Sequence, residues 1–315
     1  MSGFRKATRQ QVKASIMIEG LAGSGKSGLA LAIANTLSPN WEKIYAIDAE
    51  NKSLDLFEGE PIHTKEPFGA FNKVDLTPEE GYAPSTYDKY RQMAIANEGE
   101  VLIIDSMSHM WNREGGLLDR VSALSKSNTG RDFNVWQHPE IIKEKALNFD
   151  LIRSNKIHTI TTVRTKEKFA MEKNETTNKN EVVSLGEQQI QQEGLKYEPD
   201  LVLRMEKAGT REGGVPVAKV LKSRYGMFTV GESYEFTAGV LKAFGDYLSQ
   251  GVSAEEIEEA QKKEFIEGIK EFGKKSKLNM SLWKTVKKDQ GFEEVAIEDI
   301  PYMSIRKMYY QLVQQ

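Results

Sequence analysis

The chain contains no cysteine among its 315 residues and only four histidines, which are widely separated. The absence of cysteine excludes disulfides, thiol nucleophiles and cysteine-based zinc sites together. The histidines (His63, His109, His138 and His158) show no paired metal-ligand spacing. The sequence therefore indicates neither a disulfide-stabilised fold nor a metal centre built on cysteine or histidine.

Long apolar runs and a strong charge of either sign are also lacking. No apolar run approaches the ~18–20 residues that a membrane span needs, and the opening MSGFRKATRQQVK lacks the apolar core of a secretory signal. A net charge of −3 argues against a molecule built as a whole for nucleic acid, although a local basic surface stays possible. We therefore expect a cytoplasmic globular protein that does not enter a membrane.

Short apolar strands do alternate with helical segments over the first 250 residues. Strands are predicted at 15–19, 43–48, 101–105, 157–163, 200–205, 215–221 and 233–237. Helical patterns follow several of them, in SGLALAIANTL and around 85–95 and 138–154. This order predicts an α/β fold whose mostly parallel sheet is flanked by helices on both faces.

The composition divides the chain into three parts. A basic leader occupies 1–14, the α/β core 15–250, and a small helical appendage 254–315, introduced by a capping box at Ser253 and Glu256. Inside the core, 166–195 is long, polar and almost without periodicity. Such a segment within a compact domain is usually a functional loop or disordered.

A glycine-rich loop stands between the first strand and the first helix. Residues 20–27, GLAGSGKS, match the phosphate-loop pattern G-x-x-x-x-G-K-[ST] at every fixed position. Its backbone N–H groups and the helix N-terminus would face phosphates, with Lys26 on the β- and γ-phosphates and Ser27 on Mg²⁺. The residues predicted to bind the nucleotide are Gly20, Gly23, Ser24, Gly25, Lys26, Ser27 and Gly28.

Asp105 ends the apolar strand VLIID, the position of a magnesium-associated aspartate in such proteins. Because the carboxyl ends of parallel strands face the ligand crevice, Asp105 is predicted beside the Mg²⁺ together with Ser27. The predicted cofactors are therefore ATP and Mg²⁺. The alternative for Asp105 is a simple turn former.

The tract IYAIDAENKSLDL resembles the RecA recombinases, in which the glutamate of the matching tract polarises the attacking water. Glu50 occupies that position here. A carboxylate at the tip of a neighbouring strand reaches the γ-phosphate through one water. The resemblance thus implies a RecA-like ATPase core with Glu50 as its catalytic carboxylate, the alternative being a surface glutamate.

The tract VLKSRYG is similar to the paired cations that RecA-like ATPases and hexameric helicases carry on a late strand. In those families the pair reaches the γ-phosphate of a neighbouring subunit. Lys222 and Arg224 match it, so the resemblance implies a catalytic role in trans and a homo-oligomer. Two solvated basic residues are the alternative.

Four longer tracts resemble phage-encoded RecA-like ATPases, some of which are classed as single-strand-annealing recombination proteins. They open at Arg5, Val101, Ile160 and Glu193 and lie within residues 4–240. Two departures from RecA are present. TTVR at 161–164 replaces its γ-phosphate-sensing glutamine, and its N-terminal polymerisation helix is missing, which favours rings or short filaments.

Nucleic acid has three candidate sites. The segment SHMWNREGG at 108–116 and the segment 164–194 follow strands where RecA-like proteins place DNA-facing loops. Basic residues flank Trp283 in the appendage, although that ring also fits a small helical core. The candidate contacts are Arg164, Lys166, Lys168, Phe169, Lys275 and Trp283.

These observations predict an ATPase that acts on single-stranded DNA in recombination or replication, by annealing or protein loading. ATP or ADP, single-stranded DNA, further copies of the chain and a single-strand-binding protein are its predicted partners. A nucleotide-switched oligomeric regulator acting through a protein partner is the alternative. A small-molecule kinase fits less well, because the sequence shows no arginine-rich lid.

Overall fold

The computed structural model describes residues 11–60, 67–127, 135–153, 156–173, 180–206, 215–252 and 254–313. The chain forms two compact units. The larger is Lys13–Leu248, and the smaller comprises the chain from Ser249 onward together with Gln11 and Val12. No helix of the described residues is long and apolar enough to cross a membrane.

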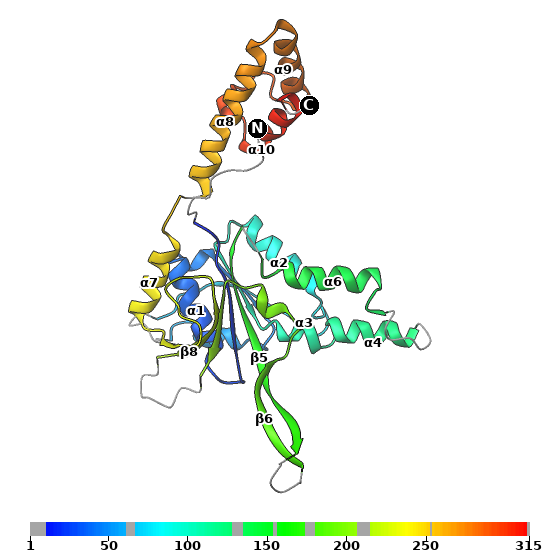
Figure 1. Cartoon of the computed structure of the whole chain (residues 1–315), viewed down its shortest axis with the longest axis vertical. Helices are drawn as coiled ribbons and strands as arrows, with labels where there is room; N and C mark the ends of the chain where they lie inside the picture. Colours follow the sequence, from blue (N-terminus) through cyan, green and yellow to red (C-terminus); the bar gives the residue numbers. More distant parts are fainter. Residues whose placement is uncertain are drawn as a thin grey trace. The chain divides into compact units, whose positions relative to one another are not determined.

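The larger unit is built on a mixed sheet, most of which is parallel (Figure 1). Its strand order is β3-β2-β4-β5-β1-β7-β8-β9, and β6 pairs with β5 off this path. The strands are β1 Ser15–Gly20, β2 Ile44–Asp48, β3 Asn72–Asp75, β4 Val101–Asp105, β5 His158–Lys173, β6 Asn180–Gln189, β7 Leu201–Met205, β8 Val217–Ser223 and β9 Ser233–Glu235. Neighbours from β3 to β7 run parallel, whereas β8 and β9 are antiparallel additions.

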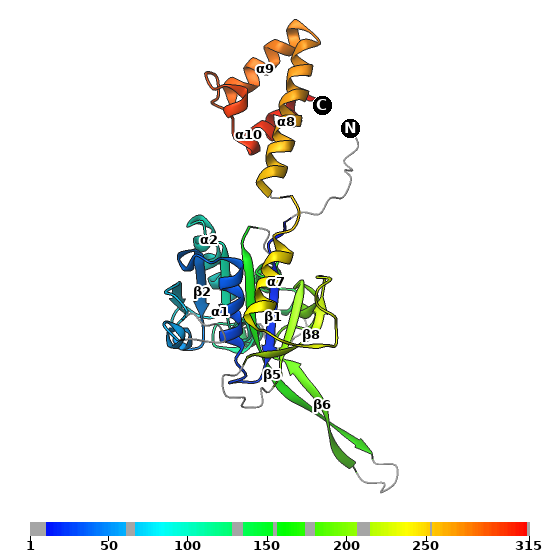
Figure 2. The same cartoon turned by 90° about the vertical axis from the view of Figure 1, so that its left-hand side faces the viewer.

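Helices cover both faces of this sheet, as Figures 1 and 2 show. They are α1 Lys26–Leu37, α2 Pro84–Ala96, α3 Ser108–Asn112, α4 Leu117–Ser127, α6 Pro139–Asp150 and α7 Ala238–Leu248, with short 3-10 turns η1 Trp41–Lys43, η2 Ser53–Phe57 and η3 Leu195–Tyr197. The predicted α/β fold with a mostly parallel, helix-flanked sheet is confirmed.

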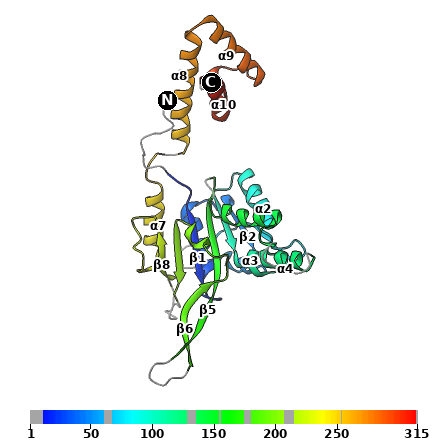
Figure 3. The same cartoon turned by 45° about the vertical axis from the view of Figure 1, so that its right-hand side comes forward.

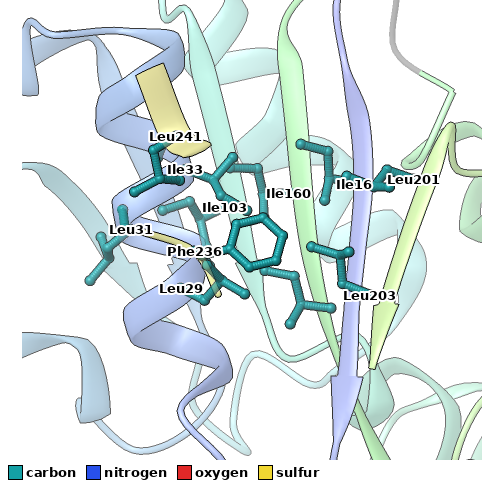
Figure 4. Packing of buried hydrophobic residues seen from close by; sticks show 14 of the residues in the cluster. Ile16, Leu29, Leu31, Ile33, Ile103, Ile160, Leu201, Leu203, Phe236 and Leu241 are labelled. Atoms are coloured by element: carbon teal, nitrogen blue, oxygen red, sulfur yellow. The ribbon is translucent and has the colours of Figure 1, made fainter. Parts of the chain in front are cut away.

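Alternation along the strands creates two cores, one on each face. Leu29 and Ile33 of α1 pack with Ile103 and Ile160 of the sheet and with Leu241 of α7 (Figure 4). The alternate strand residues face the other way and pack under α2 and the end of α6. Strands that are apolar on both faces are expected where helices cover both sides of a parallel sheet.

The expectation of a long unstructured segment at 166–195 is wrong. β5 continues past the sheet and pairs in antiparallel fashion with β6, so that the two strands form a ribbon that extends away from the sheet (Figure 3). Strand β3 and helices α4 and α7 are further elements that the sequence patterns did not predict.

The smaller unit consists of α8 Ala254–Lys274, α9 Lys277–Asp289, the short turn η4 Ile297–Asp299 and α10 Tyr302–Val313. Ile269, Ile300, Ile305 and Met308 form its buried centre. A Cβ at Gly268 would lie 2.4 Å from the Tyr309 ring, so this glycine permits α8 and α10 to pack closely. The helix predicted from 254 towards 274 is confirmed, while its predicted capping residue Ser253 and the leader residues 1–10 lie outside the described residues.

Candidate functional site

The carboxyl ends of the parallel strands bring the predicted site residues to one edge of the sheet. In register, Gly20 of β1 lies beside Arg164 of β5, and Asp48 of β2 lies beside Asp105 of β4. Parallel sheets present ligand crevices at this edge.

The glycine-rich loop leads from β1 directly into α1. Gly25 precedes the helix with φ of 87°, a left-handed conformation that residues with a Cβ rarely adopt. At Gly20 a Cβ would approach the Ser24 Oγ to 2.8 Å, so the loop closes tightly on itself. The Ser24 Oγ is buried and has no hydrogen-bond partner among the described residues. Gly23 lies at the tip of the turn and Gly28 in the first turn of α1. The loop therefore presents the unpartnered Ser24 hydroxyl at the N-terminus of α1.

Lys26 is a buried cation at the start of α1, with 7% of its surface exposed. Its Nζ donates to the Leu21 carbonyl at 2.7 Å, and it takes part in no ion pair among the described residues. Burial lowers the pKa of Lys26, and the nearby charges of Asp105 and Glu50 oppose that shift. A buried ammonium without a direct counter-ion is costly unless an anion completes it.

Asp105 is almost fully buried and accepts hydrogen bonds from two hydroxyls. The Ser27 Oγ donates to its Oδ2 at 2.6 Å, and the Thr162 Oγ1 donates to its Oδ1. Burial raises the pKa of Asp105, against the effect of these two hydrogen bonds. The hydroxyl pair fixes the carboxylate beside the loop. Thr162 comes from the tract TTVR at 161–164 of β5, and its hydrogen bond orients the aspartate.

Glu50 is positioned by a residue that the sequence analysis did not single out. The buried Asp48 carboxylate accepts the Glu50 N–H at 2.7 Å and the Leu54 N–H at 3.0 Å. This closes the turn after β2 and directs Glu50 toward the crevice. An aspartate at a strand end that accepts the amide two residues on is a recognisable turn signal, so Asp48 was predictable in principle.

The Glu50 carboxylate forms a two-pronged ion pair with Arg164. The Arg164 Nε donates to Glu50 Oε1 at 2.7 Å, and its Nη2 donates to Oε2. Burial alone would raise the pKa of Glu50, but the hydrogen bonds and charge of Arg164 outweigh it and lower that pKa. Arg164 was predicted to contact nucleic acid, and here its guanidinium lies at the carboxyl edge of the sheet with Glu50. Arg164 lies in register with Gly20 because β5 pairs with β1, an arrangement that the sequence pattern alone does not give.

His109 of α3 is a second residue that the motifs missed. Its ring is 2% exposed, packs against Tyr82 with centroids 5.6 Å apart, and has no hydrogen-bond partner for either nitrogen among the described residues. Burial lowers its pKa to about 4, partly opposed by the charge of Glu50. The site therefore holds a neutral imidazole within the electrostatic influence of the Glu50 carboxylate.

Lys222 and Arg224 are not part of this site within one chain. Lys222 lies in register with Val202, and Ser223 lies in register with Leu201. These β7 residues pair with the start of β1, so Lys222 and Ser223 lie at the edge of the sheet opposite Gly20. Lys222 donates to the carbonyls of Tyr197 and Pro199, while Arg224 pairs with Asp200 at 2.9 Å. Any contact with phosphates therefore requires a second molecule.

The remaining nucleic-acid candidates are spread over both units. Lys166 and Lys168 are exposed on the ribbon, and the side chain of Phe169 lies outside the described residues. The segment 108–116 begins as helix α3, in which Ser108, His109 and Met110 are buried, so this part does not form an open loop. Lys275 is exposed after α8, whereas Trp283 packs partly buried against the core of the smaller unit.

The donor set fits a magnesium-bound nucleotide. No group of three or more histidine, aspartate or glutamate side chains that could enclose a metal occurs among the described residues. Mg²⁺ suits such a setting, because it binds through one or two protein oxygens and completes its shell with phosphates and water. Ser27 and Asp105 would supply those oxygens. Among the described residues the Ser24 hydroxyl has no hydrogen-bond partner and Lys26 has no ion pair, so both could bind an anion.

No family model matches the chain, and no curated protein compared with it shows a significant match.

Proposed function

We propose that the protein is a RecA-like P-loop ATPase that binds and hydrolyses Mg²⁺-ATP and acts on single-stranded DNA. The observation that carries the proposal is the grouping of Lys26, Ser27 and Asp105 at the carboxyl edge of the sheet. A buried unpaired ammonium and a hydroxyl held 2.6 Å from a buried carboxylate suit a phosphate and its metal.

Each residue has a chemical role in this proposal. Lys26 exchanges the Leu21 carbonyl for phosphate oxygens, and the loop N–H groups bind the same anion. Ser27 and Asp105 would hold Mg²⁺, which neutralises charge on the transferred phosphate. Glu50 orients the attacking water once its carboxylate leaves Arg164, and Arg164 then faces the phosphate charge.

The DNA part of the proposal is supported by the ribbon. Strand β5 pairs with β1 as far as Gly20 and then continues into the ribbon, which begins at Thr165. Exposed Lys166 and Lys168 lie just beyond that junction. A change in the contacts of Arg164 would thus be transmitted to the base of the ribbon, where these exposed lysines lie.

The test is ATP turnover by the purified protein with and without single-stranded DNA, beside the variant Lys26→Ala. We expect turnover that DNA stimulates and that the variant loses. A matched control is Lys43→Ala, which removes a half-buried lysine that pairs with Glu98 away from the crevice. Turnover that persists in Lys26→Ala would contradict the nucleotide site.

A nucleotide-switched regulator is the second candidate. It is favoured by the engaged state of Glu50, whose carboxylate is held by Arg164, and by the mixed charge of the ribbon base. For this function we expect Lys26-dependent turnover that ignores DNA, with a nucleotide-dependent change in oligomer size.

A further inference from the structure

The smaller unit carries a groove that the nucleotide site does not use. It measures about 320 Å³ and lies between α8, α9 and the turn η4. That volume is at the small end of the range for ligand pockets, large enough for one or two side chains of a partner. The helices that border it are shown in Figure 2.

The floor of the groove is apolar. Met280 and the partly buried Trp283 of α9 face the buried Ile269 of α8 across it. Gly273 leaves room for the Met280 side chain, since a Cβ at this position would lie 3.2 Å from the Met280 Cε. This floor suits a large apolar side chain.

The rim carries three lysines, and a carboxylate pairs with one of them. Lys270, Lys274 and Lys287 line the groove, and none of the residues that line it is acidic. Lys270 pairs with Glu298 at 2.7 Å. Lys287 donates to the Glu293 carbonyl and forms no ion pair within the described part of the chain, so no carboxylate there compensates its charge. Lys274 ends α8 with no ion pair among the described residues. The ammonium groups of Lys274 and Lys287 are therefore available to bind an anionic partner.

We propose that this groove binds a short acidic peptide segment of a partner protein, with a large apolar side chain on Met280 and Trp283 and carboxylates on Lys274 and Lys287. An apolar anchor surrounded by charged contacts is a common arrangement of protein interfaces. Single-stranded nucleic acid fits less well, because base stacking needs a fully exposed ring face and the Trp283 ring is partly buried against the core of the smaller unit.

The experiment measures binding of a fluorescent six-residue peptide to the full chain by anisotropy. The probe has four alternating aspartates and glutamates followed by leucine and phenylalanine. We expect binding that weakens at least about tenfold in the double variant Lys274→Glu, Lys287→Glu, and by a similar factor when serines replace the two apolar residues.

The matched control is the double variant Lys263→Glu, Lys284→Glu. It makes the same change of charge on α8 and α9 at exposed lysines that do not line the groove. Peptide binding should stay within about twofold of the original chain in this control. Circular dichroism establishes that all variants keep their helices. Binding should also survive Lys26→Ala, which separates this inference from the proposed ATPase.

Three outcomes would overturn the proposal. One is equal weakening in the two double variants, which indicates general attraction to positive charge. Another is binding of a thymidine oligonucleotide, with no peptide binding, that the groove variant abolishes. The third is self-association of the chain that the groove variant abolishes while the peptide does not bind.

Discussion

At the scale of single residues, the crevice concentrates buried charges that cost the folded state free energy. Asp48 and Asp105 are both buried, and burial raises the pKa of each carboxyl. Lys26 is buried as well, and burial lowers its pKa. Charges held this way are a mark of binding and catalytic sites, where a ligand supplies the missing partner.

Asp105→Asn should stabilise the protein without ligand and abolish its ATP hydrolysis. The raised pKa means that the folded state disfavours the carboxylate, so a neutral side chain of the same shape removes that cost, and the Ser27 and Thr162 hydroxyls can rotate to suit it. We expect Tm to rise by a few degrees, about 1 kcal/mol in a domain of this size. Calorimetry measures this shift, and a lower Tm would contradict the argument.

Acid should destabilise the protein through His158. The Ala14 N–H donates to its Nδ1 at 2.9 Å, and burial lowers its pKa to about 3. Because the unfolded chain takes up the proton first, stability falls as pH decreases from about 6.5 towards 3. His158→Asn keeps an acceptor for Ala14 but cannot titrate. Between pH 6.5 and 4, urea unfolding should show the original chain losing up to about 3 kcal/mol more than this variant. Equal losses would contradict the assignment.

At the scale of elements, the base of the ribbon is tied into the sheet by buried polar side chains. The Glu19 carboxylate, next to the glycine-rich loop, accepts a hydrogen bond from Arg204 of β7 at 2.6 Å and another from Gln189 of β6. The Thr165 hydroxyl donates to Glu187 across the two ribbon strands at 2.5 Å. These contacts fix where the ribbon leaves the sheet.

Shortening the ribbon should therefore spare the ATPase and remove its response to DNA. Replacing residues 168–186 by an Asn-Gly turn keeps Thr165, Glu187 and Gln189 in place, and such a turn suits a two-residue hairpin. Turnover without DNA should stay within about twofold, because the base contacts remain. A truncated protein that DNA still stimulates fully would assign DNA binding to another surface.

The sequence predicted best the elements that are buried on at least one face, because burial imposes an apolar pattern on them. The strand VLIID and the first strand are mostly apolar and buried throughout because helices cover both sides, and α8 has a clear capping and charge pattern. The ribbon was missed because a two-stranded arm outside the core has no buried face to impose alternation. β3 reads NKVD, an edge strand whose polar residues give no strand signal.

The site was predictable to a similar degree and for similar reasons. Lys26, Ser27 and Asp105 follow from spacing along the chain and from strand order. The partners Thr162 and Arg164 of this site depend on β5 lying between β1 and β4, a fact of topology that no local pattern encodes.

At the scale of the whole molecule, Lys222 and Arg224 lie at the edge of the sheet opposite the glycine-rich loop. A catalytic role for them requires contact between copies, with the exposed Arg224 giving up Asp200 for a neighbour's phosphate. Hydrolysis would then depend on assembly.

Complementation between two inactive variants tests this arrangement. The variant Arg224→Ala retains Lys26 in the glycine-rich loop, whereas the variant Lys26→Ala retains the Arg224 cation. If the cation acts in trans, mixing them should restore roughly a quarter of the original turnover or more at mixed interfaces. Each variant alone should remain inactive. A mixture as inactive as its components, at concentrations where the original chain assembles, would rule out the trans role.

The continuity of β5 also bears on how related sequences should differ in length. The strand passes from the sheet into the ribbon without a turn. Side chains along a strand alternate faces with a period of two, although the register with β6 shifts by one residue between Glu167 and Phe169. Adding or removing one residue between Arg164 and the ribbon would send every later side chain to the opposite face, whereas two residues on each strand restore it. We therefore expect related sequences to differ in the length of this ribbon by two residues on each strand at a time. The length of the ribbon would then vary while the residues at its base keep their places.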